Sequence, residues 1–302
     1  MLPYIESFVL IPNIGSAQGI TPAPVGQAPG HQPSEENVDG LTAKPFWDIA
    51  SDSVNFPWAA KLEENSHIII KEFQEKMERD AEKSIFMGDS AWQNGVMGKG
   101  WSAFRLQRLG TWNVENCKEF PNTYELLRSL NIPIAIRGVC FARQGPGSGV
   151  QPHSDGRNFI LTSHLGLSIP EGKLLHNINQ HFYGSSLRNR FIWGLCFAGC
   201  WMKAGEEKRT WEEGKLTTLD TSFEHSTGNP TDSDRHVLII DYWHPELTEA
   251  ERAGLEYVYD LRNSFESGKV PFRKPKAAMK EDEGLGLGAI LSSMFGSKSD
   301  KK

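Results

Sequence analysis

The chain has 302 residues, which is enough for one domain with a substantial buried core or for two small ones. Hydrophobic residues make up 38% of it and charged residues 23%, a composition that is typical of globular proteins and excludes a largely disordered chain. The formal net charge of −6 favours neither nucleic acid nor an anionic membrane as a partner.

The composition divides the chain into three regions. Residues 1–40 contain a stretch rich in Gly, Pro, Gln and Ser, which is typical of a flexible lead-in segment. Residues 274–302 carry Lys, Glu, Gly and Ser with little periodic pattern, and we expect them to form a mobile tail. A single folded domain is therefore predicted over residues 41–273.

The apolar runs and the cysteines argue against a membrane protein or a disulfide scaffold. The longest apolar run, Phe191 to Met202, is shorter than the roughly 18 residues that a membrane helix needs, so it is predicted to be buried core. Four cysteines are too sparse for a disulfide scaffold, and Cys196 with Cys200 lacks the second pair of ligands of a zinc site. We expect a soluble protein of a reducing compartment such as the cytoplasm, without a membrane span.

Helices are predicted near both ends of the domain. The segment Trp58–Lys83 contains helix formers and an apolar stripe at helical spacing. A shorter helix is predicted to begin near Asn122 and to cover the sequence YELLRSL. Near the end of the domain, Thr248 and Glu251 form a capping box that begins a helix extending through Leu261.

The centre of the domain carries strand patterns instead. Short runs rich in Val, Ile, Phe and Thr are separated by Gly, Pro, Asp and Asn, which indicates strands joined by turns. Helices outside and many short strands between them favour a mainly β fold, a sandwich or barrel with flanking helices. The predicted strands are Ile132–Phe141, Asn158–Leu167, Lys215–Leu219 and His236–Trp243.

The sequence QPHSDGR, residues 151–157, contains a candidate pair of metal ligands. If it lies in a strand, alternate side chains share a face, so His153 and Asp155 would offer one nitrogen and one oxygen to the same ion. A second histidine would complete the two-histidine, one-carboxylate triad of non-haem iron sites, which leaves positions open for O2 and a co-substrate. The triplet alone is a weak signal, because such a histidine and aspartate are usually a hydrogen-bonded surface pair.

A second segment offers the other histidine and a buried cation. His225 lies at the end of a strand-and-turn stretch, and Arg235 begins an apolar strand farther along the chain. An arginine that faces the core needs an anionic partner, and a bidentate carboxylate matches its guanidinium best. That carboxylate could belong to bound 2-oxoglutarate or to a structural aspartate such as Asp220 or Asp241. The local spacing does not decide between the two.

Several longer motifs resemble the catalytic domain of aspartyl/asparaginyl β-hydroxylases. The resemblance covers roughly residues 40–250, begins at GLTAKPFWD (40–48), and rests on motifs too long to match by chance. The most specific of them are HLGLSIP (164–170), RTWEEGK (209–215), DTSFEHSTGN (220–229) and DYWHPELT (241–248).

This resemblance implies a double-stranded β-helix, a jelly-roll or cupin-like fold, with iron(II), 2-oxoglutarate and O2. It also implies hydroxylation of a C–H bond in a peptide or small-molecule substrate, with release of succinate and CO2. His153 and His225 match the family's two iron-binding histidines, and we expect Asp155 to bind the metal with them. Arg235 matches the arginine that binds the distal carboxylate of 2-oxoglutarate, and His164 matches a histidine near its metal-binding end.

The chain departs from the animal enzymes of this family at four positions and in one segment. Asp155 stands where those enzymes have Gly, which gives this chain a complete triad. Ile160 and Thr162 replace two arginines that recognise the acidic substrate side chain, and Ala142 replaces a serine that helps to hold 2-oxoglutarate. Residues 174–195 are predicted to be an insertion. Without those arginines, we expect a less acidic substrate.

Two other functions are compatible with the same residues. A cupin-like metal-dependent enzyme that does not use 2-oxoglutarate would keep the triad and leave Arg235 structural. A non-catalytic binding protein of the same fold would be expected to have lost a metal ligand first, and the intact triad argues against it. The sequence carries no signature of the substrate's identity or of the oligomeric state.

Overall fold

The computed structural model describes residues 30–32, 36–80, 86, 100–174, 197–266 and 268. Contacts divide the chain into two units, one running from Val9 to Glu256 and the other made of Met1–Phe8 with Tyr257–Lys302. The fold and the site described below lie in the first unit. The lead-in up to residue 29, residues 175–195 of the predicted insertion, and the C-terminal tail lie outside the described residues.

A seven-stranded antiparallel sheet forms the larger layer of the fold, in the order β1-β11-β6-β13-β4-β2-β3. The four predicted strands are confirmed as β4, β6, β11 and β13. Strands β6, β13 and β4 form the centre of this sheet, and β11 lies between β6 and the edge strand β1. The bounds are β1 Phe46–Trp47, β2 Trp101–Arg108, β3 Thr111–Trp112, β4 Ile134–Gln144, β6 Ile160–Ser168, β11 Leu216–Asp220 and β13 Arg235–Trp243.

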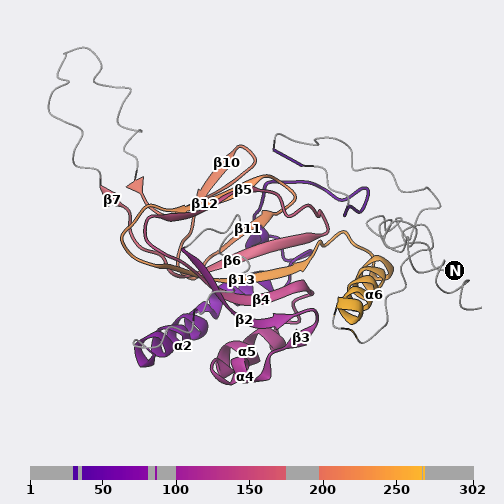
Figure 1. The fold of residues 1–302 in the computed structure, drawn as a ribbon, viewed down its shortest axis with the longest axis horizontal. Coiled ribbons are helices and arrows are strands. Elements are labelled where there is room, and N and C mark those ends of the chain that lie inside the picture. The colour runs from indigo at the N-terminus through magenta and orange to yellow at the C-terminus, as the bar shows by residue number, and fades with distance from the viewer. Residues whose placement is uncertain are drawn as a thin grey trace, which may run out of the picture. The chain divides into compact units, whose positions relative to one another are not determined.

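A four-stranded antiparallel sheet, in the order β10-β9-β12-β5, forms the second layer. Figure 1 shows this smaller sheet lying over the larger one. Side chains from both sheets share one apolar core, which confirms the predicted mainly β, double-stranded β-helix fold. The bounds are β5 Ser148–His153, β9 Trp201–Ala204, β10 Glu207–Thr210 and β12 His225–Asn229, and a separate pair joins β7 Lys173–Leu174 to β8 Phe197–Ala198.

Helices cover the other face of the larger sheet, so its central strands are buried on both sides (Figure 1). On β4, Phe141 packs with the helices while its neighbour Ala142 packs towards the smaller sheet, as the alternation of a strand requires. The helices and the short 3-10 turn η2 have the bounds η2 Ile49–Ser51, α1 Ala59–Glu64, α2 Ser66–Arg79, α4 Val114–Lys118 and α5 Pro121–Ser129.

The predicted helix at Trp58–Lys83 is two helices, α1 and α2, separated at Asn65. The Asn65 side chain donates to the carbonyl of Lys61 at 2.8 Å, and this local bond competes with the continuation of one helix. The last helix, α6, spans Glu249–Glu266, and the predicted capping box is confirmed because Thr248 N–H donates to Glu251 at 2.8 Å. No helix in the described part of the chain is long and apolar enough to cross a membrane.

One buried carboxylate fastens α5 to α2. Glu72 accepts hydrogen bonds from both the backbone and the side chain of Asn122 and of Thr123, at 2.6 to 2.9 Å, so it satisfies free N–H groups at the start of α5. We expect Glu72→Ala to lower the free energy of unfolding by about 2–3 kcal/mol, because buried donors lose a charged acceptor. Urea unfolding measures this, with the exposed Glu75→Ala on the same helix as the neutral control.

Candidate metal centre and its surroundings

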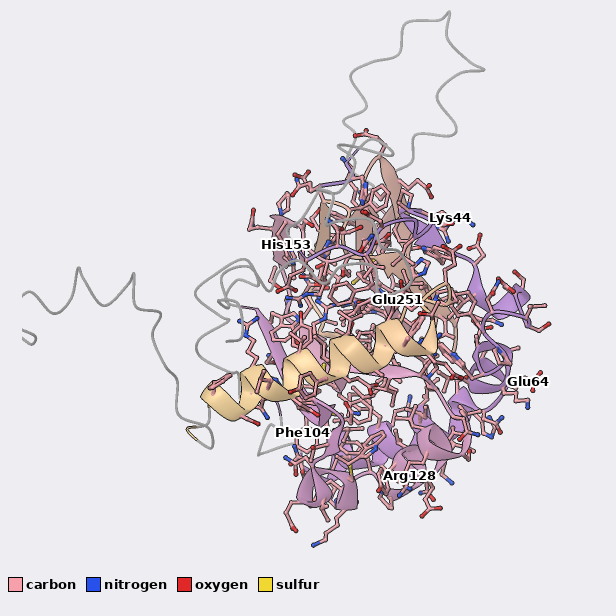
Figure 2. All side chains as sticks on the ribbon, turned by 90° about the vertical axis from the view of Figure 1, so that its right-hand side faces the viewer. Lys44, Glu64, Phe104, Arg128, His153 and Glu251 are labelled. Atoms are coloured by element: carbon pink, nitrogen blue, oxygen red, sulfur yellow. The ribbon has the colours of Figure 1, made fainter. Side chains whose placement is uncertain are left out.

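Two histidines lie side by side where two strands of the smaller sheet meet. His153 is the last residue of β5 and His225 the first of β12, and the two residues are directly opposite in the strand register. Their ring centroids are 4.2 Å apart. Figure 2 shows that His153 lies well away from Arg128 on α5, so the pair is remote from the helical side of the larger sheet.

Backbone hydrogen bonds select the ring nitrogen that each histidine presents. His153 Nδ1 lies 2.8 Å from the carbonyl oxygen of Gln151, and His225 Nδ1 lies 2.9 Å from that of Phe223. A carbonyl oxygen only accepts, so Nδ1 carries the proton in both rings and Nε2 keeps its lone pair. Burial lowers the pKa of His225, which favours the neutral form that binds metals.

Asp155 reaches the histidines from a loop. We expected His153 and Asp155 to share one face of a strand, but β5 ends at His153. The loop is fastened instead to the segment before β12: Asp155 N–H donates to the Thr221 carbonyl at 2.9 Å, and the Ser154 hydroxyl donates to that of Ser222 at 3.0 Å. The side chains of His153 and Asp155 still converge, through these contacts and not through strand alternation.

The ligand atoms of His153, Asp155 and His225 all lie within 4.8 Å of one another. His153 Nε2 is buried and has no hydrogen-bond partner among the described residues. Burial alone would raise the pKa of Asp155, but the positive charge of Arg137 and its hydrogen bond hold that pKa well below its usual range, so the carboxylate is ionised. Two imidazoles and one carboxylate around a shared space fit a non-haem iron(II) ion and leave room for further ligands.

Arg235, the first residue of β13, is a buried cation without an ionic partner among the described residues. Arg235 is 1% exposed, and its Nε and Nη1 have no hydrogen-bond partner among the described residues. Burial lowers its pKa to about 10, so it is still charged at neutral pH. An unpaired buried charge is costly, which makes Arg235 suited to bind an anion.

The two structural partners that we considered for Arg235 are engaged elsewhere. Asp241 forms an ion pair with Arg137 at 2.9 Å. Asp220 forms no ion pair with Arg235: its Oδ1 accepts hydrogen bonds from the backbone and hydroxyl of Ser222, its Oδ2 is buried without a partner among the described residues, and burial raises its pKa to about 7. A structural Arg–Asp pair at Arg235 is therefore absent among the described residues.

Trp211 connects Arg235 to His164. The Arg235 guanidinium lies over the Trp211 ring at 4.2 Å from its centroid, and the His164 ring is stacked parallel to Trp211 with centroids 5.9 Å apart. His164 Nδ1 is buried without a partner in the described chain. Burial, and then the positive charges of Arg235 and Arg137, lower the pKa of His164 far below its usual value, so this imidazole is neutral. No local pattern in the sequence singles out Trp211 as a residue of the site.

Gln144 is a second polar residue that the sequence did not indicate. It is fully buried and lies opposite Arg235 in the register of β4 and β13, so both side chains lie on one face of the larger sheet. Its Oε1 accepts from the Thr227 hydroxyl of the smaller sheet at 3.2 Å, which places the amide between the sheets. Its Nε2 is buried and lacks a partner among the described residues.

Arg137 brings a positive charge beside one of the two positions where the related animal enzymes have arginine. Its Nη2 donates to the Thr162 hydroxyl at 2.8 Å, although Thr162 and Ile160 themselves are uncharged. Arg157, the other arginine nearby in sequence, pairs with Glu36 at 2.7 Å.

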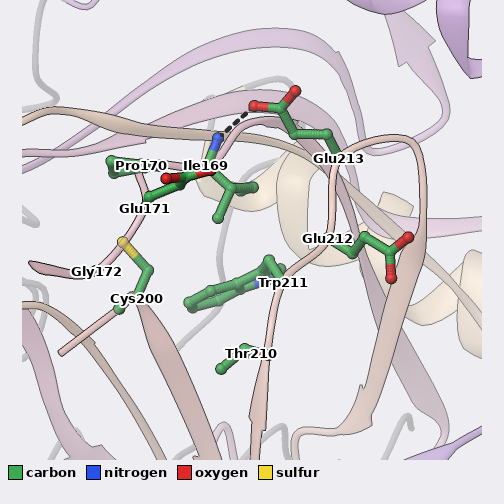
Figure 3. Close-up of a pocket in the computed structure, with 10 residues that line it drawn as sticks. Ile169, Pro170, Glu171, Gly172, Cys200, Thr210, Trp211, Glu212 and Glu213 are labelled. Atoms are coloured by element: carbon green, nitrogen blue, oxygen red, sulfur yellow. Dashed lines mark hydrogen bonds between the residues drawn. The ribbon is translucent and has the colours of Figure 1, made fainter. Parts of the chain in front are cut away.

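A pocket of about 420 Å³ lies beside Trp211. Figure 3 shows the Trp211 ring pointing across it towards Cys200, and the Ile169 N–H donating to Glu213 at 2.9 Å on its rim. The lining excludes the three triad residues, so the pocket is not where a metal would sit. Trp211 therefore lines this pocket and also contacts Arg235 and His164.

Comparison with known proteins gives one family. The family model described as aspartyl/asparaginyl beta-hydroxylase matches residues 63–245. The aspartyl/asparaginyl beta-hydroxylase of Mus musculus is 31% identical over 251 residues, which are 80% of this chain and 30% of the mouse protein. This chain therefore spans less than a third of the length of that relative.

A bacterial sequence relative and a solved structure are also similar to this chain. The ornithine lipid ester-linked acyl 2-hydroxylase of Rhizobium tropici is 27% identical over 197 residues, which are 64% of this chain and 60% of that protein. Among solved structures, a Pseudomonas putida prolyl-4-hydroxylase has a TM-score of 0.34 at 14% identity, with 59% of this chain and 86% of that one covered.

Proposed function

Because this chain belongs to the aspartyl/asparaginyl β-hydroxylase family, we propose that it is an iron(II)- and 2-oxoglutarate-dependent oxygenase. In this proposal it hydroxylates a C–H bond of a peptide or small-molecule substrate and releases succinate and CO2. When bound, the metal and 2-oxoglutarate supply the oxidising chemistry with O2, and the chain's own residues bind, orient and shield them.

In this proposal, His153, Asp155 and His225 hold the iron. The backbone bonds at Nδ1 fix each ring so that Nε2 is the ligand atom, which removes the need to reorient the ring on metal binding. Asp155 adds the only anionic protein ligand of the three. The three side chains are half-buried, so the site is partly shielded from water.

Arg235 would bind the distal carboxylate of 2-oxoglutarate. Gln144 Nε2, on the same face of the sheet, is placed to donate a further hydrogen bond, and it can replace the serine contact that is lost at Ala142. The Trp211 ring contacts both the Arg235 guanidinium and the His164 imidazole, and His164 lies near His225 of the triad. These residues thus extend from the buried cation towards the metal centre.

The buried guanidinium of Arg235, which has no ionic partner among the described residues, is the observation that carries this proposal. A cupin-like enzyme that does not use 2-oxoglutarate would need Arg235 to be a structural residue, and the aspartates suited to that role are engaged by Arg137 and Ser222. A non-catalytic binding protein has no use for three convergent metal ligands.

Succinate release tests the proposed reaction. The full chain is incubated with Fe(II), 2-oxoglutarate, O2 and a panel of peptides, metabolites and acyl-containing lipids, with His225→Ala as the control. We expect succinate to form with the parent protein and not with the control. Metal-dependent turnover of a panel member without 2-oxoglutarate would support the cupin-like alternative instead.

We expect poor hydroxylation of aspartyl residues in disulfide-rich growth-factor-like domains. Ile160 and Thr162 offer no charge to a substrate carboxylate, and the Arg137 charge beside Thr162 is already paired with Asp155 and Asp241. A buried carboxylate would lack compensation for its lost hydration. Mass spectrometry of such a peptide measures the gain of one oxygen; efficient turnover would contradict this expectation.

A further inference from the structure

Arg137 reaches the interior because β4 is bulged beside it. The pairing of β4 with β13 shifts register between Ile240 and Tyr242, and its pairing with β2 shifts between Arg105 and Gln107. Gly138, the next residue, has a φ of +80°, and a side chain there would overlap the Gln107 backbone. Bulges of this kind redirect a side chain, and here the redirected side chain is the Arg137 guanidinium.

The guanidinium joins three elements of the fold. Its Nη1 donates to the Oδ2 of Asp155 in the loop after β5. Its Nη2 donates to Asp241 on β13 at 2.9 Å and to the Thr162 hydroxyl on β6 at 2.8 Å. Thr162 in turn donates to Asp241 at 2.5 Å, so the side of Arg137 away from Asp155 is held firmly.

The two oxygens of Asp155 therefore face different partners. Oδ2 is taken by Arg137, while Oδ1 lies 3.7 Å from His153 Nε2, on the side of the convergent histidines. Asp241 shares the guanidinium charge, which reduces the repulsion that Arg137 would otherwise exert on a bound cation. The planar guanidinium of an arginine is well suited to fix the Asp155 carboxylate, because one terminal nitrogen can bind Asp155 while the other binds groups on neighbouring strands.

We propose that Arg137 is a positioning residue that holds Asp155 so that its second oxygen faces the metal. This inference rests on the metal centre of the proposed function. The alternative role, anchoring an anionic substrate group, would use the terminal nitrogens of the guanidinium, and the contacts to Asp155, Thr162 and Asp241 already engage both of them. The remaining donor, Nε, is buried and has no partner among the described residues, so it is not accessible to a substrate.

Arg137→Lys separates positioning from simple charge. Lysine keeps the positive charge but cannot reproduce the fork that joins Asp155 to Thr162 and Asp241. Calorimetric titration of the full-length, metal-free chain with Co(II), without 2-oxoglutarate, is expected to give a Kd about tenfold or more weaker than that of the parent, as is usual when a residue that orients a ligand is lost. The Co(II) absorption spectrum should also change, because the carboxylate oxygen is no longer fixed.

Arg143→Lys is the matched control, since Arg143 lies on the same strand and pairs with Asp234 at 2.7 Å. Its Kd for Co(II) should equal that of the parent. If Arg137→Lys binds Co(II) within twofold of the parent with an unchanged spectrum, only the charge matters and the positioning role is wrong. If Arg137→Lys raises the KM for an anionic substrate while Co(II) binding is unchanged, the anchoring role replaces it.

A second variant covers the case in which Arg137→Lys does not fold. Thr162→Val is nearly isosteric and removes the hydroxyl that fastens Arg137 to Asp241. It should weaken Co(II) binding several-fold, and an unchanged Kd overturns the inference.

His153→Ala reports on the proposed function separately. Parent protein that binds no Co(II), or binds it equally without His153, overturns the metal centre itself, whereas His153-dependent binding that ignores Arg137 and Thr162 overturns only the positioning role.

Discussion

Arg235→Met is expected to weaken the binding of 2-oxoglutarate by about a hundredfold or more, since a bidentate contact contains two charge-assisted bonds of about 1.5–3 kcal/mol each. The measurement is calorimetric titration of 2-oxoglutarate into the Mn(II)-loaded protein without O2. The physical reason is that Arg235 is buried and two of its nitrogens have no hydrogen-bond partner among the described residues. A bound carboxylate can therefore pair with a cation that has already lost its water.

The same substitution should not lower the stability of the ligand-free protein. An unpaired buried charge opposes folding, and methionine fills a similar volume without that cost. Urea unfolding of the apo protein is therefore expected to give an equal or higher free energy for Arg235→Met. Arg143→Met, which removes an arginine that has an ionic partner, is the control and should leave 2-oxoglutarate binding unchanged. Unchanged 2-oxoglutarate binding in Arg235→Met would instead make Arg235 structural.

The central strands could be predicted because the larger sheet is buried on both faces. Helices cover one side and the smaller sheet the other, so β4, β6 and β13 are nearly continuous apolar runs. The strands of the smaller sheet carry no such signal: β10 reads EKRT and β12 reads HSTGN. Their position comes from pairing with distant strands, and no local pattern in the sequence predicts it.

The identity of the candidate ligands was visible in the sequence, but the way they are held was not. Asp155 is placed by contacts to Thr221 and Ser222, which lie more than sixty residues farther along the chain. Arg137 had only one local signal, the glycine that follows it inside an apolar strand, which is typical of a bulge. Gln144 had none, because its importance comes from its register with Arg235.

Asp155→Ala is expected to weaken Co(II) binding by at least about a hundredfold. Loss of a residue that only orients a metal ligand weakens metal binding by about 10- to 100-fold, and loss of the ligand itself should weaken it at least as much as the upper value. The animal enzymes that this chain resembles carry Gly at this position, so the missing carboxylate cannot by itself prevent metal binding in the family. Here the substitution does two things, since it removes the anionic ligand and also leaves Arg137 with one carboxylate partner fewer. The uncompensated guanidinium then repels the incoming cation.

The double variant Asp155→Ala/Arg137→Met separates these two contributions. If repulsion by the freed guanidinium is a large part of the loss, the double variant should bind Co(II) at least about tenfold more tightly than Asp155→Ala alone, and the two substitutions will not be additive, as is usual for residues in direct contact. If ligand loss accounts for everything, the double variant will bind as weakly as the single one. Co(II) affinity that is unchanged in Asp155→Ala would show that Asp155 is not a metal ligand in this chain, and that its carboxylate serves only to pair with Arg137.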